Sequence, residues 1–248
     1  MSTTSAEERR LDVPYEDFIN NLLPLYSGPQ VTIRVGSPSH EYNLPKALLC
    51  KQSPYFKATF EGNFREGKDL SVDLSEEDGV ISIRSFQLLV QWLYLGRVIF
   101  GELVPEEAIT ATIEFVRIAD MCQVTGMEAL MAERIKGIIM AQRATKNVSV
   151  DGHLNTLCLT TQHIVSAALL PKGHPVRGIL ASAAVAEFLQ EDKHKFVKEA
   201  EDVPEFAVDL LREVKTALKS LTMPRTSIAS KQDTTFKDPI TGQMVHLY

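Results

Sequence analysis

The sequence is poor in cysteine, holds a single tryptophan and has no excess of positive charge. Its three cysteines, Cys50, Cys122 and Cys158, lie far apart in apolar surroundings. Such a set excludes a disulfide framework or a zinc signature and fits a reducing compartment.

The 26 basic residues are outnumbered by 32 acidic ones, which gives a net charge of −6. Because sequence-independent binding of nucleic acid or anionic lipid needs clustered Lys and Arg, we expect neither as a direct partner.

Long hydrophobic runs are also missing. The longest stretch without a charged residue covers residues 152–171, and its Asn, Thr, Gln and His side chains make it too polar to span a membrane. Residues 1–10 are rich in Ser, Thr, Glu and Arg and lack the apolar segment of a secretory signal. We therefore expect a protein of the cytoplasm, the nucleus or both.

Patterns that carry catalysis or bind metals are lacking as well. Segment 62–69 is one residue from a phosphate-binding P-loop, but Asp69 replaces the Ser or Thr that would reach magnesium. His153, Cys158 and His163 recur at five-residue spacing, which does not place them on one helix face. The sequence contains no Gly-x-Ser-x-Gly, His-Glu-x-x-His or Cys-x-x-Cys motif. We predict that the protein is not an enzyme and binds no metal or cofactor.

Hydrophobic patterning predicts an α+β protein in four parts. Hydrophobic residues make up 44% of the chain and charged residues 23%, which is typical of a folded domain with a core. We expect a disordered leader at 1–13, a first domain with an N-terminal helix at 14–144, an all-helical extension at 145–222 and a flexible tail at 223–248. In the tail polar residues dominate and periodicity vanishes.

The first domain should contain a small sheet covered by helices. Apolar residues alternate in 31–35 and again in 70–74, which predicts two strands, and residues 40–44 can pair with the first of these through a turn at 36–39. Helical spacing predicts helices in the remaining segments, with Ser53 as an N-cap and Trp92 beside an apolar stripe: 15–23, 45–50, 53–60, 86–93, 109–116 and 127–138.

The clearest amphipathic helix of the chain lies in the extension. Its acidic residues come early and its lysines late, as the helix dipole favours. We expect its apolar residues to form a core face: Phe206, Leu210, Leu211, Val214, Leu218 and Leu221. We therefore favour the interpretation in which the extension packs onto the rest of the chain. The alternative is that its helices recruit a partner.

One aromatic residue, Phe64, lies in a Gly-rich, charged loop where no periodicity calls for a core side chain. Two interpretations fit the sequence equally well. The ring packs back onto the domain, or it is displayed as an anchor for a partner.

Residues 31–140 resemble a BTB/POZ domain. The resemblance rests on segments that follow one another in the family's order: 31–35, 48–60, 64–66, 70–74, 86–98 and 118–124. They include Leu-Leu-Cys-Lys-Gln-Ser-Pro-Tyr-Phe, Trp-Leu-Tyr-Leu-Gly and Ile-Ala-Asp-Met-Cys-Gln-Val, which are jointly specific although each is weak alone. Segment 174–180 resembles, more loosely, the helical region of stand-alone BTB proteins abundant in filamentous fungi.

The resemblance implies a BTB/POZ fold, a cullin-type partner site and a dimer interface. The partner site would use Phe60, Phe64 and Glu66, because the family carries an aromatic- or apolar-x-Glu element here. The dimer interface would use Tyr15, Phe18, Leu22, Gln30 and Lys46.

The chain departs from the family at the charged pocket of that interface. The family has Asp where this chain has Gln30, so Lys46 lacks its usual carboxylate, and we expect only weak homodimerisation. A buried lysine without a carboxylate is costly, so we expect Lys46 to reach solvent.

Two functions fit these features. One is a non-enzymatic interaction module that serves as an adaptor for a cullin-type ubiquitin ligase. The other is a transcriptional or chromatin-associated regulator that uses the BTB domain only for assembly. Retention of Phe64 and Glu66 favours the first, and the lack of a recognisable substrate-recruiting module favours the second.

Overall fold

The computed structural model describes residues 13–75, 80–145, 152–191, 194–222 and 234–247. The chain forms two compact units. The N-terminal unit takes in residues 1–102 and 114–126, and the C-terminal unit takes in residues 103–113 and 127–248. Helix α6 (Pro105–Met121) contributes its first part to the C-terminal unit and its second part to the N-terminal unit. None of the described helices is both long and apolar enough to cross a membrane.

The sheet of the N-terminal unit has the strand order β2-β1-β3. β1 (Gln30–Val35) pairs antiparallel with β2 (His40–Pro45) and parallel with β3 (Ser71–Leu74). The alternating residues Val31, Ile33 and Val35 are buried, as a strand with one face on the core requires. The small sheet predicted from the sequence is confirmed.

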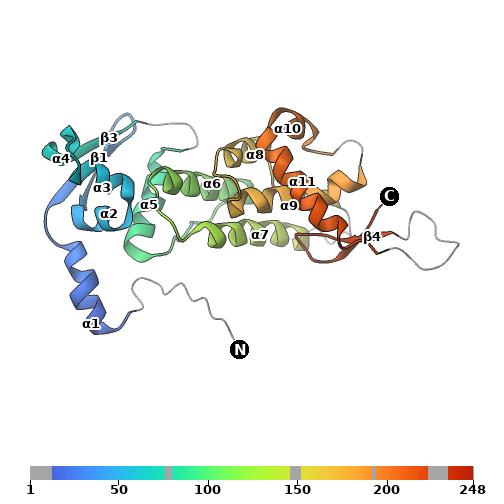
Figure 1. Cartoon of the computed structure of the whole chain (residues 1–248), viewed down its shortest axis with the longest axis horizontal. Helices are drawn as coiled ribbons and strands as arrows, with labels where there is room; N and C mark the ends of the chain where they lie inside the picture. The colour runs from blue at the N-terminus through green and yellow to red at the C-terminus, as the bar shows by residue number, and fades with distance from the viewer. Residues whose placement is uncertain (1–12, 76–79, 146–151, 192–193, 223–233, 248) are drawn as a thin grey trace. The chain divides into compact units, whose positions relative to one another are not determined.

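Helices cover this sheet (Figure 1). Tyr15–Asp17 (α1) continues through a π-helical turn, η1 (Phe18–Leu22), and a 3₁₀ turn, η2 (Leu23–Tyr26). The other helices of the unit are α2 (Lys46–Gln52), α3 (Pro54–Glu61), α4 (Arg65–Asp69) and α5 (Ile83–Leu95). Ser53 caps α3 as predicted, because its Oγ accepts a hydrogen bond from the Phe56 amide at 3.1 Å. The core of the unit includes Leu48, Leu49, Phe56, Phe60, Phe86, Leu89, Trp92, Leu93 and Phe115.

The C-terminal unit is mainly helical. After the first part of α6 it contains α7 (Glu128–Thr145), a 3₁₀ turn η3 (Gly152–Asn155), α8 (Thr161–Ala168), α9 (Pro175–Gln190), α10 (Val197–Asp202) and α11 (Pro204–Leu218). α9 lies at the centre, where α7, α8, α11 and η3 all pack against it (Figure 1). The predicted division at residue 144 therefore separates α7 from helices with which it packs.

Part of the predicted flexible tail is folded. β4 (Thr235–Lys237) and β5 (Met244–His246) form an antiparallel hairpin with Phe236, Ile240 and Val245 buried. The buried carboxylate of Asp238 holds the turn, accepting hydrogen bonds from the Ile240 amide at 3.1 Å and the Thr241 hydroxyl at 2.7 Å. The expectation of a flexible tail is wrong for 234–247, because side-chain hydrogen bonds order a segment that has no hydrophobic period. Residues 1–12 of the predicted leader and residues 223–233 and 248 of the predicted tail lie outside the described residues.

Candidate partner-binding surface

Phe64 is displayed on the surface of the N-terminal unit by a tight backbone turn. Its side chain is 60% exposed although it precedes a helix, α4, rather than lying in the open loop predicted. Gly62 makes the turn possible, because a Cβ there would collide with the Ala58 carbonyl oxygen and lie 3.0 Å from Phe64 Cδ2. One side of the ring thus rests against the Gly62 backbone, and the rest of the ring faces solvent.

Glu66 lies beside Phe64 in the first turn of α4 and is half-buried. Burial raises the pKa of the Tyr55 phenol, and the negative charge of Glu66 raises it further, so the carboxylate lies near α3. The short helix is braced by an ion pair between Arg65 Nε and Asp69 Oδ2 at 2.9 Å. Phe64 therefore presents an exposed ring, and the half-buried Glu66 follows two residues later in the first turn of α4.

Lys46 holds the end of α3 that leads into this turn. Its Nζ donates a hydrogen bond to the Phe60 carbonyl oxygen at 2.7 Å. A carbonyl in the last turn of a helix lacks an intrahelical donor and attracts a cation. Lys46 is half-buried, so it reaches solvent only in part, and its ammonium binds a backbone carbonyl in place of the carboxylate that Gln30 does not supply.

The ring of Phe60 is not part of this surface. It is only 2% exposed and stacks on Phe56 with the ring centroids 6.1 Å apart. Spacing of four residues on α3 turns both rings into the core. The assignment of Phe60 to a partner-binding site is therefore wrong, and its role is to anchor the base of the turn that carries Phe64.

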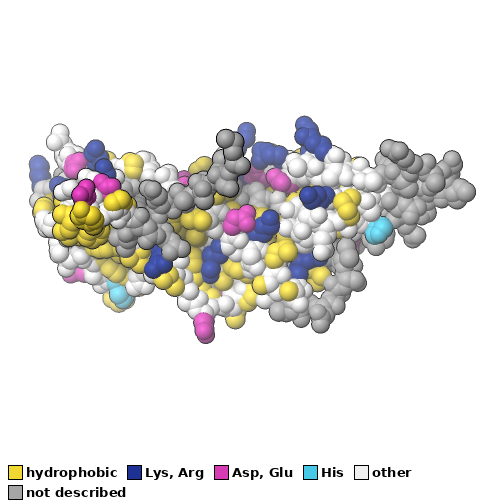
Figure 2. Space-filling view, turned by 90° about the horizontal axis from the view of Figure 1, so that it is seen from below, with side chains coloured by type: hydrophobic (Ala, Val, Ile, Leu, Met, Phe, Trp, Pro, Cys, Tyr) yellow, Lys and Arg dark blue, Asp and Glu magenta, His cyan; other side chains and the backbone are white. Residues whose placement is uncertain are grey.

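A second apolar surface lies on the N-terminal helix. Of the residues predicted for a dimer interface, Tyr15 is exposed and Phe18 and Leu22 are half-buried. Two residues that sequence reasoning did not select, Ile19 and Leu23, are also exposed and follow Tyr15 at four-residue spacing. Figure 2 shows hydrophobic side chains gathered at the left, over this helix. The four-residue spacing of Tyr15, Ile19 and Leu23 in the sequence predicts that they share one helix face.

This helix is fixed to the rest of its unit at one end. η2 packs against α2, and the Tyr26 hydroxyl donates a hydrogen bond to the Tyr94 carbonyl oxygen at 3.1 Å. Gln30 is exposed and pairs with Pro45 across the sheet, one residue from Lys46. The candidate dimer residues thus fall into two places, the N-terminal helix and the start of β1 and α2.

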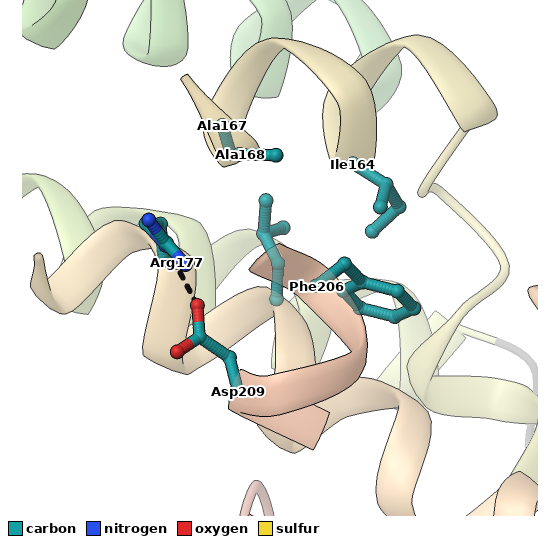
Figure 3. Close-up of a pocket in the computed structure, with 7 residues that line it drawn as sticks. Ile164, Ala167, Ala168, Arg177, Phe206 and Asp209 are labelled. Carbon is teal, nitrogen blue, oxygen red and sulfur yellow. Dashed lines mark hydrogen bonds and ion pairs between the residues drawn. The ribbon is translucent and has the colours of Figure 1, made fainter. Parts of the chain in front are cut away.

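The segment at 174–180 has a structural role in the C-terminal unit. His174 Nδ1 accepts a hydrogen bond from the Val176 amide at 3.2 Å and so caps α9. Arg177, buried, pairs its Nε with Asp209 Oδ2 of α11 at 2.6 Å, as Figure 3 shows. The cavity beside this pair measures about 10 Å³, which is the size of one water probe. The arrangement joins α9 to α11 and has no room for a larger ligand.

Cys158 and His163, two of the three residues at five-residue spacing, are engaged in packing. All three cysteines are buried, and burial raises the pKa of Cys122 to about 12, which keeps its thiol protonated. His163 is buried with Nδ1 accepting from the Thr160 amide at 3.1 Å and Nε2 lying 2.8 Å from the Thr110 hydroxyl. The side chain of His153 lies outside the described residues.

A family model matches part of the chain. The family model described as "BTB/POZ domain" matches residues 20–137. A search of curated proteins finds no match. The matched range contains β1 to β3, the turn with Phe64 and Glu66, and α5 to α6.

Proposed function

We propose that residues 20–137, which the BTB/POZ family model matches, form a protein–protein interaction module, and that this module is an adaptor that docks on a cullin-type scaffold. The observation that carries the proposal is the exposure of Phe64 next to Glu66. A large aromatic side chain displayed on a rigid turn is the kind of residue that anchors an interface. In the proposed complex Phe64 fills an apolar groove of the scaffold and Glu66 pairs with a donor at its rim.

The framework behind Phe64 supports this role. Gly62, the buried Phe60 ring and the Lys46 hydrogen bond all hold the turn in one conformation. A preorganised anchor loses little conformational entropy on binding, so more of its contact energy appears as affinity. The proposed site is non-enzymatic and needs no cofactor, and the proposed location is the cytoplasm or the nucleus.

A second candidate function is a transcriptional or chromatin-associated regulator that uses the domain only for assembly. The exposed apolar side chains of Tyr15, Ile19 and Leu23 favour this candidate, because contiguous exposed apolar residues mark interaction sites. Self-association of the domain is proposed to be weak, since at the start of β1 and α2 Lys46 binds the Phe60 carbonyl and Gln30 offers it no charge.

Affinity capture from the protein's own cells separates the two functions. Tagged wild type, Phe64→Ala and Ile99→Ala serve as baits, and the captured proteins are probed for cullin and for DNA-binding proteins. Ile99 is a matched control because it is an equally exposed apolar residue of the N-terminal unit, 62% against 60% for Phe64. If the protein is an adaptor, wild type and Ile99→Ala should capture cullin, and Phe64→Ala should capture much less cullin. Capture of DNA-binding proteins without cullin would contradict the adaptor function and support the assembly function.

A further inference from the structure

Helix α11 has apolar side chains on two faces rather than one. Phe206, Leu210, Val214 and Ala217 are buried, and α11 packs along α9 on this side (Figure 1). Leu211, however, is 60% exposed, and Val208 and Leu218 are exposed with it. The sequence-based expectation that Leu211 and Leu218 belong to the core is therefore wrong. The described part of the chain leaves this second face uncovered.

The exposed residues follow a heptad. Val208, Leu211, Lys215 and Leu218 are separated by three, four and three residues, which is the spacing of positions a, d, a and d in a coiled coil. All four are exposed, so the row forms a continuous seam along the free side of α11, called here the α11 seam. Such spacing on an exposed face fits another helix running alongside it.

Charged residues flank only one side of the seam. Glu205, Arg212 and Lys219 recur every seven residues at the e positions and are exposed. On the other flank the g residues are Ala207 and Val214, which carry no charge. Parallel pairing would bring e against g and leave the charges without complements. Antiparallel pairing of two identical helices brings e against e, which places Glu205 of one copy opposite Lys219 of the other.

We propose that the α11 seam binds the α11 seam of a second copy of the chain, antiparallel and about a two-fold axis. The register that pairs Glu205 with Lys219 of the other copy also sets Val208 opposite Leu218 and Leu211 opposite Lys215. The aliphatic stem of Lys215 covers Leu211 while its ammonium reaches water. Arg212 meets its own equivalent at the axis, and each Arg212 is paired at 2.7 Å with Asp209 of its own copy, a carboxylate that it shares with Arg177.

The proposed contact is weak. Two heptads bury far less than the roughly 800 Å² per partner of a standard stable interface. The interaction therefore adds to other contacts between copies and acts mainly through effective concentration once the copies are held together. It uses neither Phe64 nor the N-terminal helix, so its failure and the failure of the proposed cullin function are separate results.

A charge exchange in the full-length protein tests the pairing. Glu205→Lys alone places two lysines opposite each other, and Lys219→Glu alone places two glutamates opposite each other, so each variant should self-associate several-fold more weakly than wild type at low salt. Mixing the two single variants restores both pairs in the mixed dimer. Sedimentation analysis of the mixture should then show association of at least wild-type strength. A mixture that associates no better than either variant alone overturns the proposal.

Proximity is tested independently with a short bis-maleimide cross-linker. The native cysteines are buried, so Leu211→Cys and Lys215→Cys provide the reactive thiols. Mixed, differently tagged single variants should cross-link with each other several-fold more than either cross-links with itself. Leu130→Cys on α7 is the control, at an exposed position outside the seam. Mixed cross-linking at the level of the control, or preferential self-cross-linking as in a parallel pair, contradicts the proposed arrangement.

Discussion

The buried ion pair between Arg177 and Asp209 makes the C-terminal unit sensitive to the loss of either partner. The two side chains are 7% and 3% exposed and their charged atoms lie 2.6 Å apart. Arg177 also donates to the Leu170 carbonyl oxygen at 2.8 Å and to the Glu205 carbonyl oxygen at 3.1 Å. Each guanidinium nitrogen therefore has an acceptor, and the group ties α8, α9 and α11 together.

Removing Asp209 leaves the buried Arg177 without its carboxylate, and removing Arg177 leaves the buried Asp209 with only the more exposed Arg212, 2.7 Å away. Removal of one member of such a pair costs roughly 3–5 kcal/mol, so Arg177→Met and Asp209→Leu should each lower the free energy of unfolding by about that amount. The double variant leaves two backbone carbonyls without donors and the partly exposed Arg212 without its carboxylate, which together cost about 2–3 kcal/mol. The losses are therefore expected to be strongly non-additive.

Urea unfolding followed by far-UV circular dichroism measures these losses in the helices. Trp92, the sole tryptophan, belongs to the N-terminal unit, so its fluorescence separates that unit's transition from the other. Arg212→Met is the matched control: its side chain is 46% exposed, and it should cost at most ~1 kcal/mol while Asp209 keeps Arg177. Additive losses in the double variant, or single losses as small as that of the control, would refute the reasoning.

Three further changes test other contacts. Trp92→Ala should lower the free energy of unfolding by ~3–5 kcal/mol because the ring is buried against Phe115, and an unchanged thermal midpoint would place it at the surface instead. Lys46→Met should lower the free energy of unfolding by about 1–2 kcal/mol, because the Phe60 carbonyl loses a charged donor. A urea titration followed by Trp92 fluorescence measures this loss, and no loss would mean that water replaces the lysine. Burial lowers the pKa of His163 below its ordinary value, so the unfolded chain binds the proton first and stability should fall as the pH drops below about 6.5. His163→Gln, which offers an acceptor and a donor without titrating, should make the thermal midpoint less sensitive to pH between 7 and 5, and an identical pH dependence would contradict this role for the histidine.

Local patterns accounted for most of the N-terminal unit. Alternation identified β1 because Val31, Ile33 and Val35 face one core, and Ser53 followed by Pro54 fixed the start of α3. Both signals depend on residues close in sequence. The family resemblance placed Phe60 at a partner surface, whereas its helical spacing from Phe56 turns its ring inward.

Long-range contacts were beyond such patterns. The hairpin of β4 and β5 has strands of three residues, and it is held by Asp238, whose two carboxylate oxygens accept hydrogen bonds from Asn155 Nδ2 at 3.1 Å. Hydrophobic periodicity cannot predict a hydrogen bond between residues more than eighty positions apart, such as Asn155 and Asp238. Likewise, the apolar residues of α11 form two faces, and sequence spacing alone could not tell that Leu211 lies outside the core.

The central claim is that Phe64 and Glu66 form the docking element for a cullin-type scaffold. The most direct measurement is calorimetric titration of the full-length protein with the N-terminal fragment of a cullin, for wild type, Phe64→Ala, Glu66→Ala and the control Ile99→Ala. Phe64→Ala should weaken binding by ~2 kcal/mol or more and Glu66→Ala by less, since a central aromatic anchor contributes more than a rim carboxylate. All variants should keep the thermal midpoint of the wild type, because both side chains lie outside the core. Wild-type protein that shows no binding at high micromolar concentration would contradict the claim and leave assembly as the function of the domain.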